Sequence, residues 1–368
     1  MNSVDEEFIS QCLRKYYYEY FGIIDIPSKL NRHEFGYQKP NSPMIRHIQL
    51  QDAAELRSTL MQELPLDVFL SSARYLFPSL PMAEKEWQDA DLIFDIDAKD
   101  LNLECRPSHT VQICATCGKV NNKGCACDSP QIKDVSVTCD RCINASKKEV
   151  KKLLDILYDD IGIKESQTEV YFSGNDGFHI HVHDLKFLNL NSLERSELVD
   201  YVMCNGILPE RLGMKREGAT SLPQLTDAGW PGRFARHMFG SKTARPKEIK
   251  KITADGYARF TDTLKRLSHT LGACIDSGVT TDVHRIFRMP GTINGKSGMT
   301  KMACPDIAKF NPYKDAVLIN DNKVTVNALC PIPFKLMNKK FGPYNNKDVD
   351  IPSYAAMYLM CKGLAHRV

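Results

Sequence analysis

The chain has 368 residues, of which 43% are hydrophobic, so it is long enough for one large core with insertions or for two modest domains. No stretch approaches the ~20 apolar residues that a membrane span needs, and no export signal is recognisable, so we expect a soluble, intracellular protein with no membrane partner. The net charge of +3 does not identify a charged partner, because patches of opposite sign can cancel in the total.

The N-terminal segment predicts a helix followed by a hairpin. Apolar and aromatic residues at helical spacing predict an amphipathic helix over residues 6–21. The runs RHEFGYQ (32–38) and MIRHIQL (44–50) flank a Pro-Asn-Ser-Pro turn and read as two short strands. We therefore expect an early hairpin that carries basic residues.

The next segments lead to an acidic strand. Residues 52–63 predict a helix that is capped at its start, whereas the apolar run at 64–78 fits either a helix or a strand. Residues 90–98 read ADLIFDIDA and predict a strand. Because successive side chains of a strand point to opposite faces, we expect Asp95 and Asp97 to project together.

A helix and a second hairpin follow a cysteine-rich stretch. Residues 146–162 predict a helix, with Ser146 as its N-cap and Gly162 at its end. Strands are predicted at 168–174 and 178–184, and the turn residues NDG lie between them.

The remainder of the chain is less strongly patterned. Residues 193–271 are helix-rich, with loop-like interruptions at 227–233 and 243–248. Residues 275–301 combine turn residues with short strand-like pieces. Two further strand candidates, AVLIN and KVTVNAL, come after them.

The two aspartates of the acidic strand suggest a cation site. Two carboxylates on one face of an otherwise apolar strand are unfavourable together unless a positive group lies between them. A divalent cation meets this need, because Mg²⁺ prefers hard oxygen ligands. An acidic pair of this kind occurs equally well on a solvent-facing strand, so the pair alone does not decide.

Eight metal-ligand residues lie between the acidic strand and the helix at 146–162. Closely spaced pairs let two ligands from one turn share a tetrahedral zinc ion, so eight ligands predict two structural zinc ions, and the spacing leaves open which pairs share an ion. The pairs are Cys105 with His109, Cys114 with Cys117, Cys125 with Cys127, and Cys139 with Cys142.

Three motifs, in this order, carry a resemblance to a known family. They are ADLIFDIDAKDL, SGNDGFH and RMPGTINGKSG, with the cysteine cluster between the first two. Together they resemble the small catalytic subunit of archaeal and eukaryotic DNA primases. The resemblance implies an α+β fold with a mixed-sheet catalytic core, a zinc-binding insertion and a helical subdomain. It also implies a DNA-directed nucleotidyltransferase that makes short RNA, or DNA, primers by two-metal chemistry.

The same resemblance assigns roles to single residues. It implies that Asp95, Asp97 and Asp276 bind Mg²⁺ or Mn²⁺, and Asp282 is the main rival for the third position. The residues matched to nucleotide binding are Ser173, His179, Arg288, Lys296 and Arg46.

This chain departs from the family pattern at three positions. Asn175 and Asp176 stand where family members commonly carry arginine, and Asn294 stands where they often carry histidine. Positive charge for a triphosphate must therefore come from elsewhere, and Asn294 is at most a weaker hydrogen-bonding substitute.

The resemblance also implies how the zinc ligands pair. Cys105, His109, Cys139 and Cys142 match the family's zinc site, which leaves Cys114, Cys117, Cys125 and Cys127 for an additional zinc ribbon. The alternative combines Cys114 and Cys117 with Cys139 and Cys142.

Domain boundaries and partners follow from the resemblance as well. We expect a large primase subunit, a single-stranded DNA template and nucleoside triphosphates as partners, in the cytoplasm of an archaeon or the nucleus of a eukaryote. The expected units are a discontinuous core at 1–184 and 271–345, a zinc-binding insertion at 104–143, a helix-rich subdomain at 185–270 and a C-terminal helical tail at 346–368.

Two other functions share these features. A repair or translesion primase-polymerase of the same superfamily would use the same carboxylates, but it would extend ends rather than start chains. A zinc-ribbon protein that binds nucleic acid without chemistry would carry the acidic strand incidentally.

Overall fold

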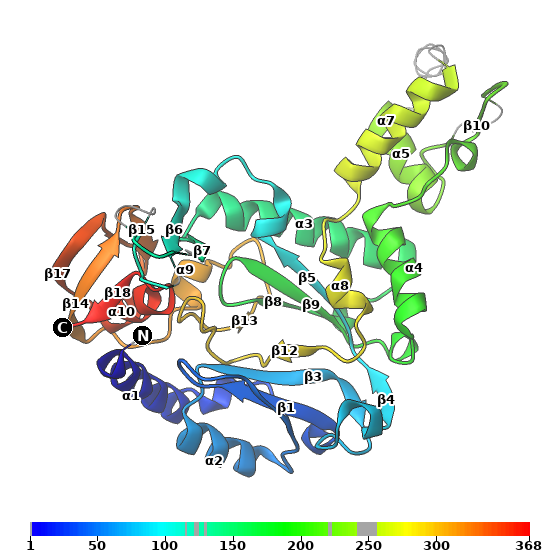
Figure 1. The fold of residues 1–368 in the computed structure, drawn as a ribbon. Helices are drawn as coiled ribbons and strands as arrows, with labels where there is room; N and C mark the ends of the chain where they lie inside the picture. Colours follow the sequence, from blue (N-terminus) through cyan, green and yellow to red (C-terminus); the bar gives the residue numbers. More distant parts are fainter. Residues whose placement is uncertain (1, 115, 121–124, 129–130, 220–222, 241–255) are drawn as a thin grey trace.

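The computed structural model describes residues 2–114, 116–120, 125–128, 131–219, 223–240 and 256–368. Two antiparallel sheets lie next to each other in the centre of the molecule, and helices α5 and α7 extend away from them (Figure 1). A smaller C-terminal sheet lies beside the N-terminal helix, so the two chain ends are close together. The described residues include no helix that is both long and apolar enough to cross a membrane.

The first sheet holds the early hairpin and a strand from the last third of the chain. Its order is β12-β3-β1-β2, and β4 also pairs with β3. The predicted hairpin is confirmed by the antiparallel pairing of the first two strands, and the ambiguous run at 64–78 contains a strand. The strands are β1 (His33–Gln38), β2 (Ile45–Ile48), β3 (Asp67–Tyr75), β4 (Trp87–Ala90) and β12 (Ile286–Arg288).

Two predicted helices lie below this sheet in Figure 1. Helix α1 (Ser3–Glu19) starts earlier than predicted because Asn2 and Asp5 form a capping box, each side chain accepting from the other residue's main-chain N–H. Helix α2 (Ala53–Glu63) matches its prediction, with Asp52 accepting from two main-chain N–H groups at its start.

The second sheet contains the acidic strand. Its order is β13-β8-β9-β5, which makes β5 an edge strand, and all the strands predicted in it are confirmed. The bounds are β5 (Leu92–Asp97), β8 (Thr168–Phe172), β9 (Gly177–Val182) and β13 (Met302–Ala303).

Helix α3 (Asp140–Ile156) packs on β5 and β9, and it begins six positions before the predicted start. The prediction of Ser146 as N-cap is wrong, because Ser146 is buried on the same helical stripe as Ile143 and Val150. The helix continues as a π-helix (Leu157–Ile161) and ends, as predicted, at Gly162 in the left-handed conformation.

The expectation of mixed sheets is wrong for the described residues, since every strand pair among them is antiparallel. The physical reason is connectivity. Short turns join β1 to β2 and β8 to β9, and such turns can only link antiparallel neighbours. The coarser expectation of an α+β fold is confirmed.

The C-terminal sheet has the order β17-β14-β18 and differs from the expectation at two places. KVTVNAL forms β14 (Lys323–Cys330), as predicted. AVLIN (316–320) forms no strand: it follows α9 (Pro312–Asp315) directly and is an irregular segment in which Ala316, Val317 and Ile319 are buried. The tail at 346–368 is not wholly helical. Only α10 (Ser353–Cys361) is a helix, and β17 (Tyr344–Pro352) and β18 (Ala365–Arg367) pair with β14 on either side of it.

The segment at 185–270 is helical, as expected, in its described part. It contains α4 (Ser192–Met203), α5 (Gly229–Phe239), α7 (Gly256–Leu271) and the two-residue strands β10 (Met214–Lys215) and β11 (Gly218–Ala219). The interruption predicted at 227–233 is wrong, because α5 starts at Gly229 and tolerates Pro231 in its first turn. The interruption at 243–248 lies outside the described residues.

A buried arginine ties α4 to the beginning of the acidic strand. Arg195 is 1% exposed, and its guanidinium donates to the main-chain oxygens of Ala90, Asp91 and Leu190 at 2.8, 3.0 and 3.0 Å. Because unsatisfied buried acceptors cost about 1–3 kcal/mol each, we expect Arg195→Met to lower the free energy of unfolding by about 3 kcal/mol. Denaturant unfolding checks this. The exposed Arg141→Met should change the value by less than about 0.5 kcal/mol, and equal effects of the two variants would contradict the role of Arg195.

Candidate functional site

A polar pocket of about 230 Å³ lies where the two central sheets meet. It is lined from the second sheet by β5, β9 and the turn between β8 and β9, and from the first sheet by β3 and β12. The short helix α8 (Ser277–Thr281) and the turn after β12 complete it. Its lining side chains with polar or charged groups are Asp95, Asp97, Lys99, Ser173, Asn175, Asp176, His179, Asp276, Arg285, Arg288, Asn294 and Lys296.

The acidic strand presents its two carboxylates as predicted. Leu92, Phe94 and Ile96 are fully buried on one face of β5, and Asp95 and Asp97 both line the pocket on the other. Residue 177 pairs with Asp97 across the strands and is glycine, and a Cβ there would overlap the Asp97 side chain. A glycine at this position is therefore needed for the Asp97 carboxylate to lie where it does.

The third carboxylate of the pocket comes from Asp276. Its main-chain N–H donates to the Asp95 carbonyl oxygen at 2.9 Å, and its side chain caps α8 by accepting from Val279 N at 3.3 Å. The rival Asp282 is exposed, accepts from His284 N at 2.9 Å and is not among the lining residues. The structure thus brings Asp276, and not Asp282, to the two aspartates of β5.

The buried carboxylates lack enough local positive charge. Burial, and then the neighbouring Asp97, raise the pKa of Asp95 to about 8, and burial followed by Asp176 raises the pKa of Asp97. Lys99 contacts Asp97 at 2.7 Å, whereas Oδ1 of Asp95 is buried with no hydrogen-bond partner among the described residues. An oxygen set with one buried unpartnered atom and raised pKa values fits a divalent cation.

His179 lies directly beside this pair. Its Nε2 is 3.4 Å from Oδ1 of Asp95, and its Nδ1 has no hydrogen-bond partner in the part of the chain that is described. Burial, and then the charge of Lys301, lower the pKa of His179 well below its ordinary value. The ring is therefore neutral, and one of its two nitrogens can donate a hydrogen bond.

The other residues matched to nucleotide binding also line the pocket, with one exception. Ser173 is buried, with its hydroxyl accepting from Gly177 N at 3.3 Å, and the Asn294 amide donates to the Ser173 carbonyl oxygen at 2.9 Å. Arg288 pairs with Asp67 and donates to the main-chain oxygen of Ile293 at 2.7 Å. Lys296 is exposed at the same pocket.

Arg46 is the exception. Its guanidinium pairs at 2.8 Å with Glu34, a fully buried carboxylate that also pairs with the fully buried Lys85 at 2.7 Å. Arg46 is not among the lining residues of the pocket. The structure therefore places it in an ion-pair network of the first sheet.

Several pocket residues were missed from the sequence. Lys99 and Arg285 line the pocket and supply positive charge that Asn175 and Asp176 do not. Asp176 itself pairs with Arg106 at 3.3 Å. Strand alternation gave no signal for Lys99, because β5 ends at Asp97 and Lys99 lies in the 3-10 helix Ala98–Leu101 that follows it.

Nothing in the sequence around Lys301 indicates that it lies near the pocket. It is fully buried behind the pocket, where its Nζ lies 3.2 Å from His181 Nε2 and donates to the Arg288 carbonyl oxygen at 3.0 Å. Burial, and then the charge of Arg288, lower the pKa of Lys301 to about 7. It connects β9, which carries His179, to β12, which carries Arg288.

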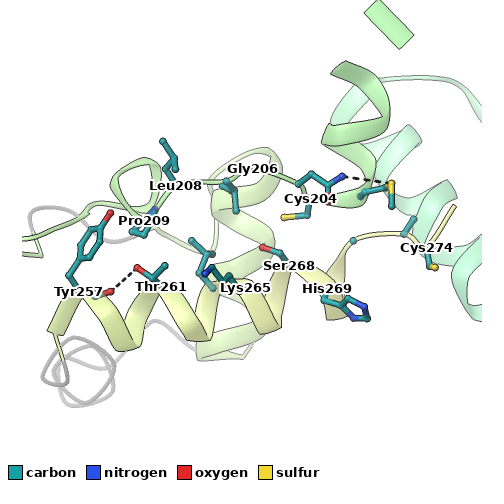
Figure 2. Close-up of a pocket in the computed structure, with 16 residues that line it drawn as sticks. Cys204, Gly206, Leu208, Pro209, Tyr257, Thr261, Lys265, Ser268, His269 and Cys274 are labelled. Atoms are coloured by element: carbon teal, nitrogen blue, oxygen red, sulfur yellow. Dashed lines mark hydrogen bonds between the residues drawn. The ribbon is translucent and has the colours of Figure 1, made fainter. Parts of the chain in front are cut away.

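A roomier pocket of about 560 Å³ lies in the helical segment, between the end of α4 and α7 (Figure 2). Among its lining residues are Cys204, Leu208, Tyr257, Lys265 and His269, and it has no aspartate or glutamate. It shares no lining residue with the acidic pocket. Its side chains do not form a carboxylate site for a cation.

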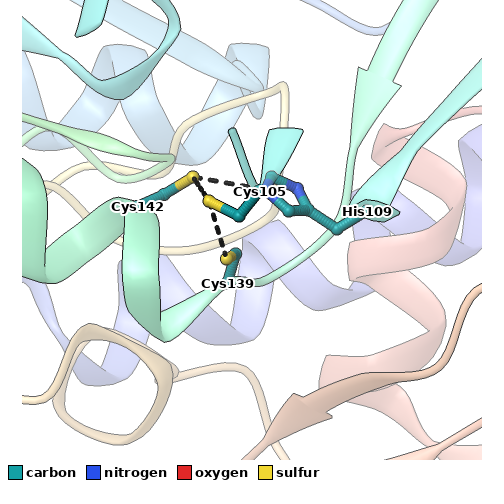
Figure 3. Close-up of side chains that lie close together, drawn as sticks. All are labelled: Cys105, His109, Cys139 and Cys142. Carbon is teal, nitrogen blue, oxygen red and sulfur yellow. Dashed lines mark hydrogen bonds between the residues drawn. The ribbon is translucent and has the colours of Figure 1, made fainter. Parts of the chain in front are cut away.

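Two Cys/His clusters lie at the hairpin of β6 (Thr110–Cys114) and β7 (Ile132–Ser136). In the first cluster, the side chains of Cys105, His109, Cys139 and Cys142 converge (Figure 3). Sγ of Cys105 lies 3.7 Å from that of Cys142 and 3.9 Å from that of Cys139, and Cys142 Sγ lies 3.3 Å from His109 Nε2. A tetrahedral ion with Zn–S bonds of ~2.3 Å would hold its sulfurs about 3.8 Å apart, so this donor set fits zinc.

The second cluster consists of Cys114, Cys117, Cys125 and Cys127, with all four sulfurs within 4.8 Å of one another. The grouping that the resemblance implied is therefore the one in the structure. The alternative, in which Cys114 and Cys117 join Cys139 and Cys142, is wrong, because the two sets lie at opposite ends of the hairpin.

Comparisons with known proteins agree along almost the whole chain. A family model for the DNA primase small subunit matches residues 128–302. The chain is 50% identical over 370 residues to a DNA primase small subunit of Nitrosopumilus maritimus and 45% identical over 369 residues to one of Cenarchaeum symbiosum, each match covering 99% of both chains. It is 31% identical to a DNA primase small subunit of Methanococcoides burtonii, over 96% of this chain and 97% of that protein.

Proposed function

The chain belongs to the family of DNA primase small subunits, and from this we propose that its acidic pocket is the site where nucleotides are joined on a DNA template. One observation supports this assignment above the others. Carboxylates from separate parts of the chain, Asp95 and Asp97 on β5 and Asp276 at α8, line one pocket together with basic side chains.

We assign the three carboxylates to two divalent cations, Mg²⁺ or Mn²⁺. When bound, such ions would activate the primer 3′-hydroxyl and neutralise the negative charge of the triphosphate during in-line displacement. The protein's part is to fix the ligand geometry. β5 orients Asp95 and Asp97 through its pairing with β9, and the N–H of Asp276 on the Asp95 carbonyl holds the third carboxylate beside them.

We assign the triphosphate to the remaining side chains of the pocket. The Ser173 hydroxyl and a neutral His179 would each donate to a phosphate oxygen. Arg288, which is braced by Asp67, and the exposed Lys296 would add positive charge. Lys99 and Arg285 line the same pocket and would compensate for the arginines that are absent at positions 175 and 176.

We propose that the first Cys/His cluster holds a structural zinc ion. Burial, and then Arg106, lower the pKa of His109, so its ring is neutral and able to act as a ligand. Cys139 and Cys142 lie at the start of α3, the helix that packs on β5, so an ion here would anchor that helix. Four protein ligands leave no open position, which favours a structural role.

The assembly and the domain division are part of the proposal. The family name implies a large-subunit partner, and we add a single-stranded template and nucleoside triphosphates. We retain a discontinuous catalytic core, a zinc-binding insertion at 104–143 and a helical subdomain at 185–270. The boundary at 345/346 crosses β17, which pairs with β14, so the tail belongs with the C-terminal sheet.

Asp276 and Asp282 offer a matched test of the catalytic site. We expect Asp276→Asn to lower the rate of primer synthesis by about 10²- to 10³-fold, because an amide cannot replace a charged ligand of the cations. Asp282→Asn should stay within about twofold of the wild type, since its carboxylate lies outside the pocket.

The assay should contain the protein, its large subunit, free nucleotides and bare single-stranded DNA. Formation of dinucleotides distinguishes a primase from an enzyme that only extends ends. The assignment fails if Asp282→Asn is the more damaging variant, or if Asp276→Asn keeps full activity.

A further inference from the structure

Four cysteines form a cluster that the proposed catalytic site does not use. Cys114 is the last residue of β6, and Cys117, Cys125 and Cys127 lie between β6 and β7. Sγ of Cys114 lies 4.0 Å from that of Cys127, and Sγ of Cys117 lies 3.6 Å from that of Cys125. A disulfide would need about 2.05 Å, and all four residues are free cysteines, so these are not cross-links. The distances instead bracket the ~3.8 Å expected between sulfurs around one tetrahedral zinc.

The chain around Cys114 is folded into a turn that suits a metal. Cys114 accepts from Gly118 N at 2.8 Å through its carbonyl oxygen and donates to Lys119 O at 2.9 Å through its N–H. Gly118 has a φ of 70°, which a residue with a side chain rarely adopts. This tight turn brings the sulfurs of Cys114 and Cys117 to the same side.

The cluster is separate from the first one. The paired strands of the hairpin run from Thr110 opposite Ser136 to Cys114 opposite Ile132. The four steps of ~3.4 Å from Thr110 to Cys114 separate the two ends by roughly 14 Å, so the clusters cannot share an ion. The first cluster lies at the end that packs against the catalytic core, where Arg106 pairs with Asp176.

We propose that a second Zn²⁺ is bound as a tetrathiolate by Cys114, Cys117, Cys125 and Cys127. This ion stabilises the outer end of the hairpin independently of the first cluster. Binding would release four thiol protons and involves no oxidation or reduction. With four protein ligands the ion is structural. Its presence does not depend on the catalytic assignment, because it would be measured as bound metal.

Metal content of the full-length chain, purified without chelator, tests this second site. We expect two equivalents of zinc per chain in the wild type and one in Cys117→Ser/Cys125→Ser. The matched control is Cys274→Ser, a partly exposed cysteine outside both clusters, which should keep two. The core of the double variant should still unfold cooperatively, because the two substituted cysteines lie away from α3 and β5.

Thiol accessibility in the unmodified protein provides a second measurement if the double variant does not fold. Alkylation followed by mass spectrometry should find Cys117 and Cys125 protected compared with Cys274, and a strong chelator should abolish the protection. When Co²⁺ replaces zinc, the absorption spectrum should contain the bands of two sites, one with four sulfur ligands and one with three sulfur ligands and one nitrogen ligand. One equivalent of zinc in the wild type, with Cys117 and Cys125 alkylated as fast as Cys274, would overturn the proposal.

Discussion

Replacing both Asp95 and Asp97 by asparagine is expected to lower the rate of primer synthesis by at least about 10³-fold without unfolding the protein. Asparagine keeps the size and the polar surface of aspartate, but it removes the negative charge that would hold the cations. The measurement is primer synthesis at saturating Mg²⁺ and Mn²⁺. Asp100→Asn is the matched control, because Asp100 lies close by on the chain, is 43% exposed and does not line the pocket.

The single replacement Asp95→Asn should stabilise the metal-free protein at neutral pH. Burial raises the pKa of Asp95 from 3.8 to about 8, so this carboxyl ionises in the unfolded chain at lower pH than in the folded one. The stability of the metal-free wild type should therefore fall as pH rises from about 4 to about 8. Asp95→Asn removes the part of this pH dependence that Asp95 contributes.

Unfolding with EDTA at pH 5 and pH 8 checks the sign of this effect. The stability of Asp95→Asn relative to the wild type should increase from the lower to the higher pH. Added Mn²⁺ should raise the melting temperature of the wild type more than that of the variant. A variant that loses stability relative to the wild type as pH rises would contradict the description of this pocket. Undiminished primer synthesis by the variant that lacks both carboxylates would instead mean that catalysis does not depend on this pocket.

Cys142→Ser is expected to have the largest effect on folding, lowering the free energy of unfolding by several kcal/mol. Cys142 is 2% exposed in the first turn of α3, and loss of one ligand would release the ion that anchors this helix. Structural zinc in small peptides contributes about 10–16 kcal/mol of apparent binding free energy, so even partial loss is large compared with typical protein stability.

Thermal unfolding and zinc analysis of the variant check this expectation. Cys204→Ser is the control, because Cys204 is also buried, at 3% exposure, but lies outside both clusters. The free energy of unfolding of Cys204→Ser should fall by about 1–2 kcal/mol, because the variant buries a hydroxyl, and its zinc content should be unchanged. Equal destabilisation of the two variants, or unchanged zinc in Cys142→Ser, would exclude a metal role for Cys142.

Local patterns were sufficient to predict the acidic strand and the residues of the two Cys/His clusters. Strand alternation alone predicted that Asp95 and Asp97 share a face, and the structure confirms it, because β5 is an edge strand with a buried apolar face. Ligand spacing identified the eight Cys and His residues, but their grouping depends on the hairpin. Only its pairing shows that Cys114 and Cys139 lie at opposite ends.

Long-range packing explains what the sequence could not predict. The choice between Asp276 and Asp282 depends on one hydrogen bond to the Asp95 carbonyl, between positions far apart in the chain. The predicted start of α3 was wrong because serine is a common N-cap residue, whereas Ser146 is buried by tertiary contacts in the interior of the helix. Nothing in the local sequence shows that Lys301 is buried, or that Arg46 pairs with Glu34.

The position of β12 has a consequence for how the enzyme is made. This strand comes from residues 286–288 but completes the sheet formed by the first ninety residues, and Asp276 reaches β5 from the same late part of the chain. During translation, the early hairpin and the acidic strand leave the ribosome long before either partner exists. A nascent chain therefore cannot assemble the pocket until most of the protein has been synthesised, so truncated products would lack the site rather than hold a weakened version of it.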